Sequence, residues 1–339
     1  MSGGITQLVV QGIQDKHLTQ NPQISFFHSY YSRHTNFSQL VKQQTINGNI
    51  KNNGISTVHF ERSGDLLSYV YFTIDDGTQS VFTTDWTLLI EKVELLIGGQ
   101  VIDEQDSIFS ERIAVDLMAQ NVSKSSNGPH SGSVGTISYF YPLRFFFCEN
   151  WKSCLPLISL QYHDVDIRIT WSSQIENYNI KCWANYVFLD EMERLKYSES
   201  SKNMLIYQVQ KTTASNEKIQ ELVFNNPVKY IASTGLTSTT NEINLQINGT
   251  DLGEYKFTQP HHVDIPMYYN TKYVTSPTIF LYPFCLSTSE LQPTGSLNFS
   301  MIDSARIISE NENVTDDIYA VNYNILKIEN GMGGLLYAN

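Results

Sequence analysis

Pairs of carboxylates are the side chains of this chain whose type and spacing could do chemistry. Asp164 and Asp166 lie two residues apart, so a β-strand would place both on one face, where they could bind a metal ion or act as an acid and a base. Val165 and Ile167 alternate with them, and this pattern is typical of a half-buried strand with one wet face. We therefore interpret the two aspartates as part of a solvated strand face.

Two adjacent aspartate pairs and one adjacent histidine pair are further candidates. Asp75-Asp76-Gly77 lacks the remaining ligands of a calcium loop and predicts a turn, and Asp316-Asp317 is the third carboxylate pair. Metal sites on strands commonly use two histidines one residue apart, which project to the same side. His261 and His262 are adjacent and would face opposite ways on a strand, so we predict no metal site and no cofactor site.

Cysteines and glycine-rich motifs give no catalytic site either. The four cysteines match no zinc spacing, and we expect them to be reduced and mostly buried; they are Cys148, Cys154, Cys182 and Cys285. A disulfide between Cys148 and Cys154 is the alternative in an oxidising setting. No nucleophile-elbow, phosphate-loop or dinucleotide motif is present, and Gly331-Met332-Gly333-Gly334 predicts a flexible C-terminal turn. The chain is predicted not to be an enzyme, with no catalytic residue.

Charge and composition limit the partners. The chain has 22 basic and 34 acidic residues, a net charge of -12, and no basic run, which argues against direct nucleic-acid binding. Charged residues make up 17% of the chain, below the usual ~25%, and tyrosines are plentiful. Extensive polar interfaces or simply a polar β protein would each explain this composition. No run of ~20 apolar residues and no secretory pattern is visible, so we expect a soluble chain made in the cytosol.

Periodicity predicts an all-β protein with about eight strands in each half. The 339 residues suit two domains. The strand candidates of the first half are 25–32, 58–60, 66–74, 88–97, 138–147, 165–171 and 180–189. Those of the second half are 204–210, 219–224, 229–233, 243–247, 278–282, 296–308 and 318–328. Gly98-Gly99 and Asn248-Gly249 predict tight hairpins, because both sequences favour positive φ.

Three segments interrupt the strands. Residues 108–120 predict a short helix within a loop, because apolar and charged residues are interspersed there. Residues 121–136 are rich in Ser, Gly and Asn and predict an exposed loop. Residues 190–201 are charged and without alternation, which predicts a partly helical linker between the two domains.

Collinear motifs run through the whole chain and carry a resemblance to a known family. The central one is LPLISLQYHDV, at residues 155–165, and Phe145, Phe147 and Cys148 precede it. The others are GGITQLV through RHTNF at residues 3–37, the segment 189–208, YPF through NFSMID at residues 282–303, and AVNYNILKIENGMGGLLYAN at residues 320–339. His34 and His163 lie within these motifs, and we interpret both as structural. In this order the motifs resemble the major capsid proteins of nucleocytoplasmic large DNA viruses and of related smaller viruses.

The resemblance implies two consecutive eight-stranded antiparallel jelly rolls, with few short helices in loops. We expect an N-terminal arm at 1–23, a first jelly roll at 24–189, a linker at 190–203 and a second jelly roll at 204–339. The implied function is a structural capsid protein whose pseudo-hexameric homotrimers tile an icosahedral viral shell. Expected partners are other copies of the chain, neighbouring capsomers, minor capsid proteins and an internal membrane side. The expected location is the virion, after synthesis and assembly in the host cytoplasm.

The chain is shorter than many members of that family, whose outer loops carry large insertions. Its longest loop candidates are 121–136 and 248–277, which implies low outer towers. A minor capsid paralogue of the same fold is therefore one alternative, and the major protein of a smaller related virus is another. A carbohydrate-binding β-sandwich is an alternative from a different class, favoured by the many tyrosines and by Trp86, Trp151, Trp171 and Trp183.

Overall fold

The computed structural model describes residues 3–83, 85–125, 138–199, 201–273 and 279–337, and the chain divides into two compact units. The first unit, residues 1–36, carries helices α1 (Gly3–Val9) and α2 (Lys16–Thr19), neither of which buries a residue. The strand expected at 25–32 is wrong, because these residues form turns and irregular backbone. The first strand, β1, begins at Phe37, where the second unit also begins.

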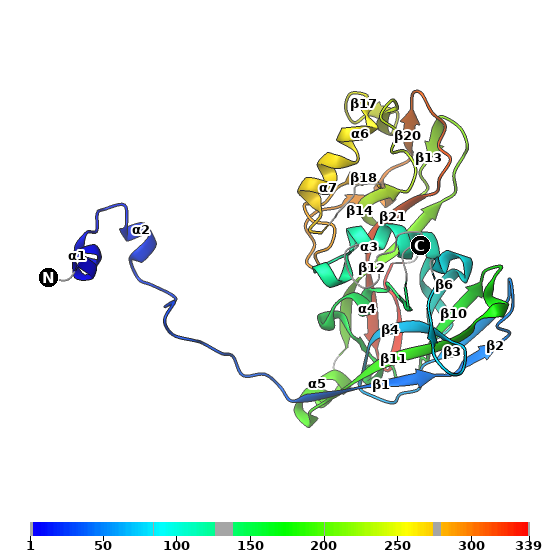
Figure 1. Ribbon diagram of the computed structural model, residues 1–339, viewed down its shortest axis with the longest axis horizontal. Coiled ribbons are helices and arrows are strands. Elements are labelled where there is room, and N and C mark those ends of the chain that lie inside the picture. Colours follow the sequence, from blue (N-terminus) through cyan, green and yellow to red (C-terminus); the bar gives the residue numbers. More distant parts are fainter. Residues whose placement is uncertain (1–2, 84, 126–137, 200, 274–278, 338–339) are drawn as a thin grey trace. The chain divides into compact units, whose positions relative to one another are not determined.

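The second unit, residues 37–339, contains every strand that the structure describes (Figure 1). Its first half has β1 (Phe37–Gln44), β2 (Ile46–Gly48), β3 (Ile55–His59), β4 (Leu66–Asp75), β5 (Ser80–Val81), β6 (Ile90–Ile97), β7 (Gln100–Asp106), β8 (Phe140–Pro142), β9 (Leu155–Pro156), β10 (Val165–Trp171) and β11 (Asn179–Leu189). Its second half has β12 (Lys202–Thr212), β13 (Ile219–Glu221), β14 (Pro227–Ser233), β15 (Glu242–Ile247), β16 (Thr250–Asp251), β17 (Lys256–Phe257), β18 (Phe280–Pro283), β19 (Leu297–Asn298), β20 (Ala305–Ser309), β21 (Ile318–Glu329) and β22 (Met332–Leu335).

The strand order is the same in both halves. One sheet of the first half runs β1-β11-β4, with β8 and β9 on the far edge of β4, and the other runs β3-β10-β6-β7. The second half repeats this as β12-β21-β14-β18 and β13-β20-β15-β16. Eight main strands can be numbered along each half, leaving out the short β2, β5, β9, β17, β19 and β22. Both halves then read 1-8-3-6 and 2-7-4-5, which is the order of a jelly roll. The prediction of two consecutive antiparallel jelly rolls is confirmed.

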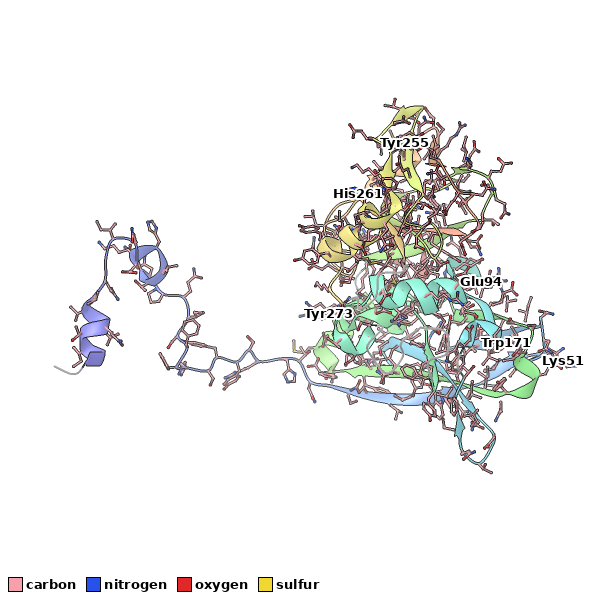
Figure 2. All side chains as sticks on the ribbon, turned by 45° about the horizontal axis from the view of Figure 1, so that its top comes forward. Lys51, Glu94, Trp171, Tyr255, His261 and Tyr273 are labelled. Atoms are coloured by element: carbon pink, nitrogen blue, oxygen red, sulfur yellow. The ribbon has the colours of Figure 1, made fainter. Side chains whose placement is uncertain are left out.

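Each jelly roll closes around apolar side chains from both of its sheets. In the first, Trp171 is fully buried (Figure 2), and its indole N–H donates to Ser56 Oγ at 2.8 Å. Trp86 is buried as well, and its indole donates to Ser138 Oγ at 3.2 Å, so both large rings satisfy their one polar atom. The core of the second jelly roll contains no tryptophan and is built around Phe280 and branched aliphatic residues.

A helix from the first half covers the outer face of a sheet of the second half. Residues 109–117, which we call the buried helix, comprise a π-helical turn (Phe109–Ile113) and α3 (Ala114–Leu117). Phe109 and Leu117 pack with Tyr230 and Tyr319 of that sheet, whose opposite face forms the second core. The helix predicted at 108–120 is thus confirmed, but it lies between the jelly rolls rather than in a surface loop.

The remaining described helices are short. They are η1 (Trp86–Leu88), η3 (Val122–Lys124), α4 (Phe146–Glu149), η4 (Trp151–Ser153), η5 (Leu157–Ser159), η6 (Ile175–Asn177), α5 (Glu191–Glu199), α6 (Thr258–His261), α7 (Asp264–Asn270) and η7 (Phe299–Met301). Helix α5 confirms the partly helical segment predicted at 190–201. Among the described residues, no helix is long and apolar enough to cross a membrane.

Several segments differ from the sequence-based expectation. The strand predicted at 138–147 is reduced to β8, because α4 begins at Phe146, and the strand predicted at 296–308 is interrupted by η7. The loop expected at 248–277 contains α6 and α7. Most of the loop predicted at 121–136 lies outside the described residues, as do residues 274–277. Both hairpin predictions are confirmed, with positive φ at Gly98 and Gly99 and at Asn248 and Gly249.

Candidate functional site

The residues that suggested metal or acid–base chemistry do not form such a site. Asp164 and Asp166 extend from β10 toward solvent, where Asp164 pairs with Arg62 at 3.4 Å and Asp166 with His59 at 2.8 Å. Each aspartate thus has its own cationic or imidazole partner. No cluster of three His, Cys, Asp or Glu side chains suited to a metal ion occurs in the part of the chain that the structure describes.

The Asp75-Asp76-Gly77 segment is a turn held by its own carboxylates. Asp76 Oδ1 accepts hydrogen bonds from the backbone N–H groups of Thr78 at 2.8 Å and Gln79 at 2.7 Å, and Asp75 Oδ1 accepts one from Gly77. The hydroxyl of Thr78 and these N–H groups lower the pKa of Asp76 to about 2, because they stabilise the ionised form. The oxygens that a cation would need are therefore used within the turn.

His262 lies in the interior, and the four cysteines form no disulfide. His262 is buried against Tyr282, with ring centroids 5.5 Å apart, and desolvation lowers its pKa to about 4. His261 ends α6 on the surface (Figure 2). All four cysteines are free thiols, so the alternative disulfide between Cys148 and Cys154 is not formed.

The two jelly rolls contact each other along a surface that we call the seam. It consists of the buried helix, strands β7 and β12, and strand β22, which pairs with β21 and contacts His163 of the first half. Its apolar part is shared, since Ile206, Leu326 and Ile328 of the second half belong to the core of the first. The two halves of the chain are therefore joined by a common hydrophobic core rather than by a linker alone.

Buried polar groups fix the register of the seam. Asp103 in β7 accepts hydrogen bonds from the backbone N–H of Val209 and from Gln105 Nε2, both at 2.8 Å. Gln208 Nε2 donates to the carbonyl of Ile102 beside this contact. Burial raises the pKa of Asp103 to about 7, since these hydrogen bonds only partly offset the loss of hydration.

Ion pairs continue the seam toward the surface. Lys211 lies between Asp106 of the first half, at 3.0 Å, and Asp317 of the second, at 2.6 Å. Asp106 also accepts a hydrogen bond from the phenol of Tyr319 at 2.6 Å. These contacts place charges from both halves in one network at the rim of the shared core.

The C-terminal segment completes the seam. The flexible turn predicted at Gly331-Met332-Gly333-Gly334 is wrong, because β22 pairs with β21 and returns to the first jelly roll. The N–H of Tyr162 donates to the carbonyl of Gly331 at 2.9 Å, and His163 Nδ1 lies 2.8 Å from the carbonyl of Gly333. Gly98 packs so closely on His163 that a Cβ atom at this position would collide with the ring.

The arm, residues 1–36, is a second candidate surface and is described by itself. Many of its large apolar side chains are exposed, with Phe26 at 88% and Phe27 at 99%. The others include Ile5, Leu8, Val9, Val10, Ile13, Leu18, Ile24, Tyr30 and Tyr31. A soluble chain seldom leaves so many apolar groups in water without a partner for them.

Comparison with known proteins identifies the family of the chain. Two family models match consecutive parts of the chain: the N-terminus of major capsid proteins at residues 25–190, and the large eukaryotic DNA virus major capsid protein at residues 190–334. The chain belongs to this capsid protein family. The two matches meet at residue 190, where β11 has ended and α5 begins.

Curated relatives agree with the family models over the full length of this capsid protein. It is 32% identical to the major capsid protein of Pyramimonas orientalis virus over 397 aligned positions, which cover 100% of both chains. It is also 32% identical, again over 100% of both chains, to the major capsid protein of Paramecium bursaria Chlorella virus 1. These relatives are structural proteins, which confirms the prediction that the chain is not an enzyme.

Solved structures show the same architecture. This capsid protein matches a chain of the PBCV-1 virus capsid with a TM-score of 0.75 and 27% identity, covering 93% of this chain and 100% of the other. The Faustovirus major capsid protein matches with a TM-score of 0.63 at 11% identity, covering 94% of both chains, and so shares the fold. Asp103, His163 and Gly333 of the seam were not identified as functional residues from the sequence of this capsid protein, since only their distant partners give them a role.

Proposed function

We propose that this capsid protein forms pseudo-hexameric homotrimers that tile an icosahedral viral shell, and that assembly uses surface complementarity without a catalytic step. The observation that carries the proposal is the repetition of one strand order in two jelly rolls that share a core. Three such chains around a threefold axis place six similar sandwiches in a ring, which gives one protein a six-sided outline.

We further propose a division of labour along the chain. The two jelly rolls, which begin at β1 and at β12, form the wall of the capsomer, and the segment 190–203 connects them. The arm makes contacts with neighbouring capsomers, minor capsid proteins or an internal membrane side, in keeping with its exposed apolar residues. The net charge of -12 supports a shell that encloses a genome without binding it directly. Assembly takes place in the host cytoplasm and the product resides in the virion.

Mass measurement tests the trimer. Native mass spectrometry of the purified full-length protein is expected to give three chains per particle, and negative-stain images are expected to show six-sided outlines. A stable monomer at micromolar concentration would contradict the proposal. A trimer that enters the shell at only a few positions would instead indicate a minor capsid paralogue.

Deletion of residues 2–19 tests the arm. We expect the shortened chain to form trimers normally, because the deleted residues lie outside the compact unit of residues 37–339. Capsid assembly from these trimers should fail or give misshapen shells, as judged by electron microscopy. Normal shells would exclude a role for this part of the arm.

A further inference from the structure

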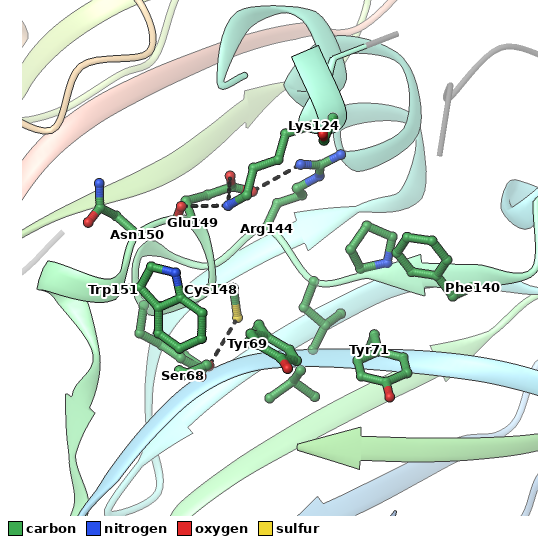
Figure 3. A pocket seen from close by; sticks show the side chains of 15 residues that line it. Ser68, Tyr69, Tyr71, Lys124, Phe140, Arg144, Cys148, Glu149, Asn150 and Trp151 are labelled. Atoms are coloured by element: carbon green, nitrogen blue, oxygen red, sulfur yellow. Dashed lines mark hydrogen bonds and ion pairs between the residues drawn. The ribbon is translucent and has the colours of Figure 1, made fainter. Parts of the chain in front are cut away.

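A pocket of about 500 Å³ opens on the first jelly roll beside the seam (Figure 3). Its floor is β4, from Ser68 to Tyr71, and its other walls come from β8, from η3 and from the segment Leu143–Trp151. This volume lies within the range of pockets that hold small organic ligands. The capsid role proposed above assigns no ligand to it.

Aromatic rings form the lower wall of the pocket. Trp151 stands edge-on to Tyr69, with centroids 5.7 Å apart, and Tyr71 stands edge-on to Phe140 at 6.2 Å. Figure 3 shows these rings on one side of the pocket and the charged side chains of Lys124, Arg144 and Glu149 on the other. Trp151 remains 60% exposed, which leaves a large apolar surface at the entrance.

Two uncharged polar side chains of the wall, Ser68 and Asn150, are engaged within the protein. Ser68 Oγ accepts a hydrogen bond from Asn185 Nδ2 at 2.8 Å. Asn150 donates to Gln120 Oε1 and accepts from the N–H of Lys152, both at 2.9 Å. The rest of the wall is mainly aromatic and apolar, which favours a ligand with an apolar body.

The charged wall carries more positive than negative charge. Glu149 pairs with Lys124 at 3.2 Å and with Arg144 at 3.1 Å, so two cations share one carboxylate. Arg144 is only 4% exposed, and its Nε has no hydrogen-bond partner. One positive charge of the three groups is therefore unmatched at the edge of an apolar space, where a charge-assisted hydrogen bond is strong.

We propose that this pocket binds an amphipathic anion, with a fatty-acid-like apolar tail against Trp151, Tyr69 and Tyr71 and its carboxylate beside Lys124 and Arg144. Burial of the apolar tail against the aromatic wall removes apolar surface from water, which favours binding. The carboxylate of the ligand balances the positive charge of Lys124 and Arg144 that Glu149 alone leaves unmatched. All lining residues of the site come from one chain.

Three probes with the same tail test the proposal on the full-length protein by isothermal titration calorimetry, each below its micelle concentration. Dodecanoate is expected to bind once per chain and to shift the fluorescence of Trp151 to shorter wavelength. Dodecanol should bind about tenfold more weakly or worse, because it cannot form the charge-assisted hydrogen bond. Dodecyltrimethylammonium should not bind measurably, because its charge has the wrong sign.

A lysine pair provides the matched variants. Lys124→Met keeps the apolar stem but removes one cation, so it should weaken dodecanoate about tenfold and leave dodecanol unchanged. Lys152→Met is the control, since Lys152 is exposed and does not line the pocket, and it should alter neither ligand. Trp151→Phe should abolish the fluorescence shift while dodecanoate still binds.

The outcomes separate the alternatives. Equal affinity for dodecanoate and dodecanol, or no effect of Lys124→Met, would overturn the assignment of an anion. Absence of saturable binding by every probe would overturn the site, whether or not the protein is trimeric.

Discussion

The same hairpin occurs once in each jelly roll, between the fourth and fifth strands. The two copies differ in the residues that contact the turn. Both turns have two residues with positive φ: Gly98 and Gly99 in the first, Asn248 and Gly249 in the second. Asn248 has room for a side chain, whose Oδ1 accepts the N–H groups of Asp303 and Ser304, both at 3.0 Å. Gly98 has none, because His163 of the seam occupies that space. The fold thus requires a tight turn in both jelly rolls, whereas the contact with His163 leaves room only for glycine at position 98 of the first turn.

The substitutions with the largest predicted effect test whether the two jelly rolls unfold as one unit. Trp171→Ala and Phe280→Ala each empty a buried aromatic site, one in each core, and each should lower the free energy of unfolding by roughly 3–5 kcal/mol. All four tryptophans lie in the first half of the chain. Because the seam joins the two jelly rolls, Phe280→Ala should nevertheless shift the tryptophan fluorescence transition in guanidinium, in step with circular dichroism.

The exposed Phe82 offers a control for that experiment, since Phe82→Ala removes a similar side chain from the surface and should change the midpoint little. If Phe280→Ala leaves the midpoint of the fluorescence transition unchanged, the jelly rolls are independent domains.

A smaller effect concerns the buried carboxyl of the seam. The pKa of Asp103 is about 7 in the folded chain, against an ordinary value of 3.8. Between these values the folded chain holds a proton that the unfolded chain has released, so the contribution of Asp103 to stability is full below about pH 4 and is lost as the pH rises through 7. The loss attributable to Asp103 is at most about 4 kcal/mol.

Asp103→Asn should flatten this part of the stability curve, measured by denaturant unfolding from pH 4 to pH 8. Asp251→Asn, in an exposed position of the corresponding strand of the second jelly roll, should leave the curve as it is. An unchanged pH dependence in Asp103→Asn would show that the buried carboxyl is not responsible.

The smallest predicted effect exchanges the residues of the two hairpins. Gly98→Asn gives the first turn the residue of the second, and it should cost on the order of 2 kcal/mol because the side chain displaces His163 from the C-terminal strand. Gly99→Asn should cost less than about 1 kcal/mol, since a Cβ atom there meets no neighbour and Asn tolerates positive φ. Equal losses of stability in the two variants would remove the distinction between the turns.

The elements that the sequence predicted well are those whose pattern is local. Val165–Trp171 alternates along one strand, and its burial alternates in the same way, because one face meets the core and the other meets water. Residues 25–32 carry aromatic residues that favour strands, but no neighbouring strand pairs with them. Strand formation depends on such partners, so the prediction failed there.

The seam could not be predicted because its residues are defined by distant partners. The buried helix was visible as a pattern, but nothing near it in the sequence indicates that Phe109 meets Tyr319. Asn322 and Asn324 are fully buried, contrary to their usual preference, because Gln210 and Gln208 satisfy them at 2.8 Å across the sheet. An aspartate such as Asp103 looks in the sequence like any other surface carboxylate.

The hydrogen bond between His163 and Gly333 joins residues 170 positions apart in the chain. During synthesis the first jelly roll emerges long before β22, the strand that contacts it, so this part of its surface stays open until β22 is made. Closure of the seam is thus coupled to the synthesis of β22. Protease treatment of chains stalled before Gly331 should cut the first jelly roll readily; resistance equal to that of the released protein would refute this coupling.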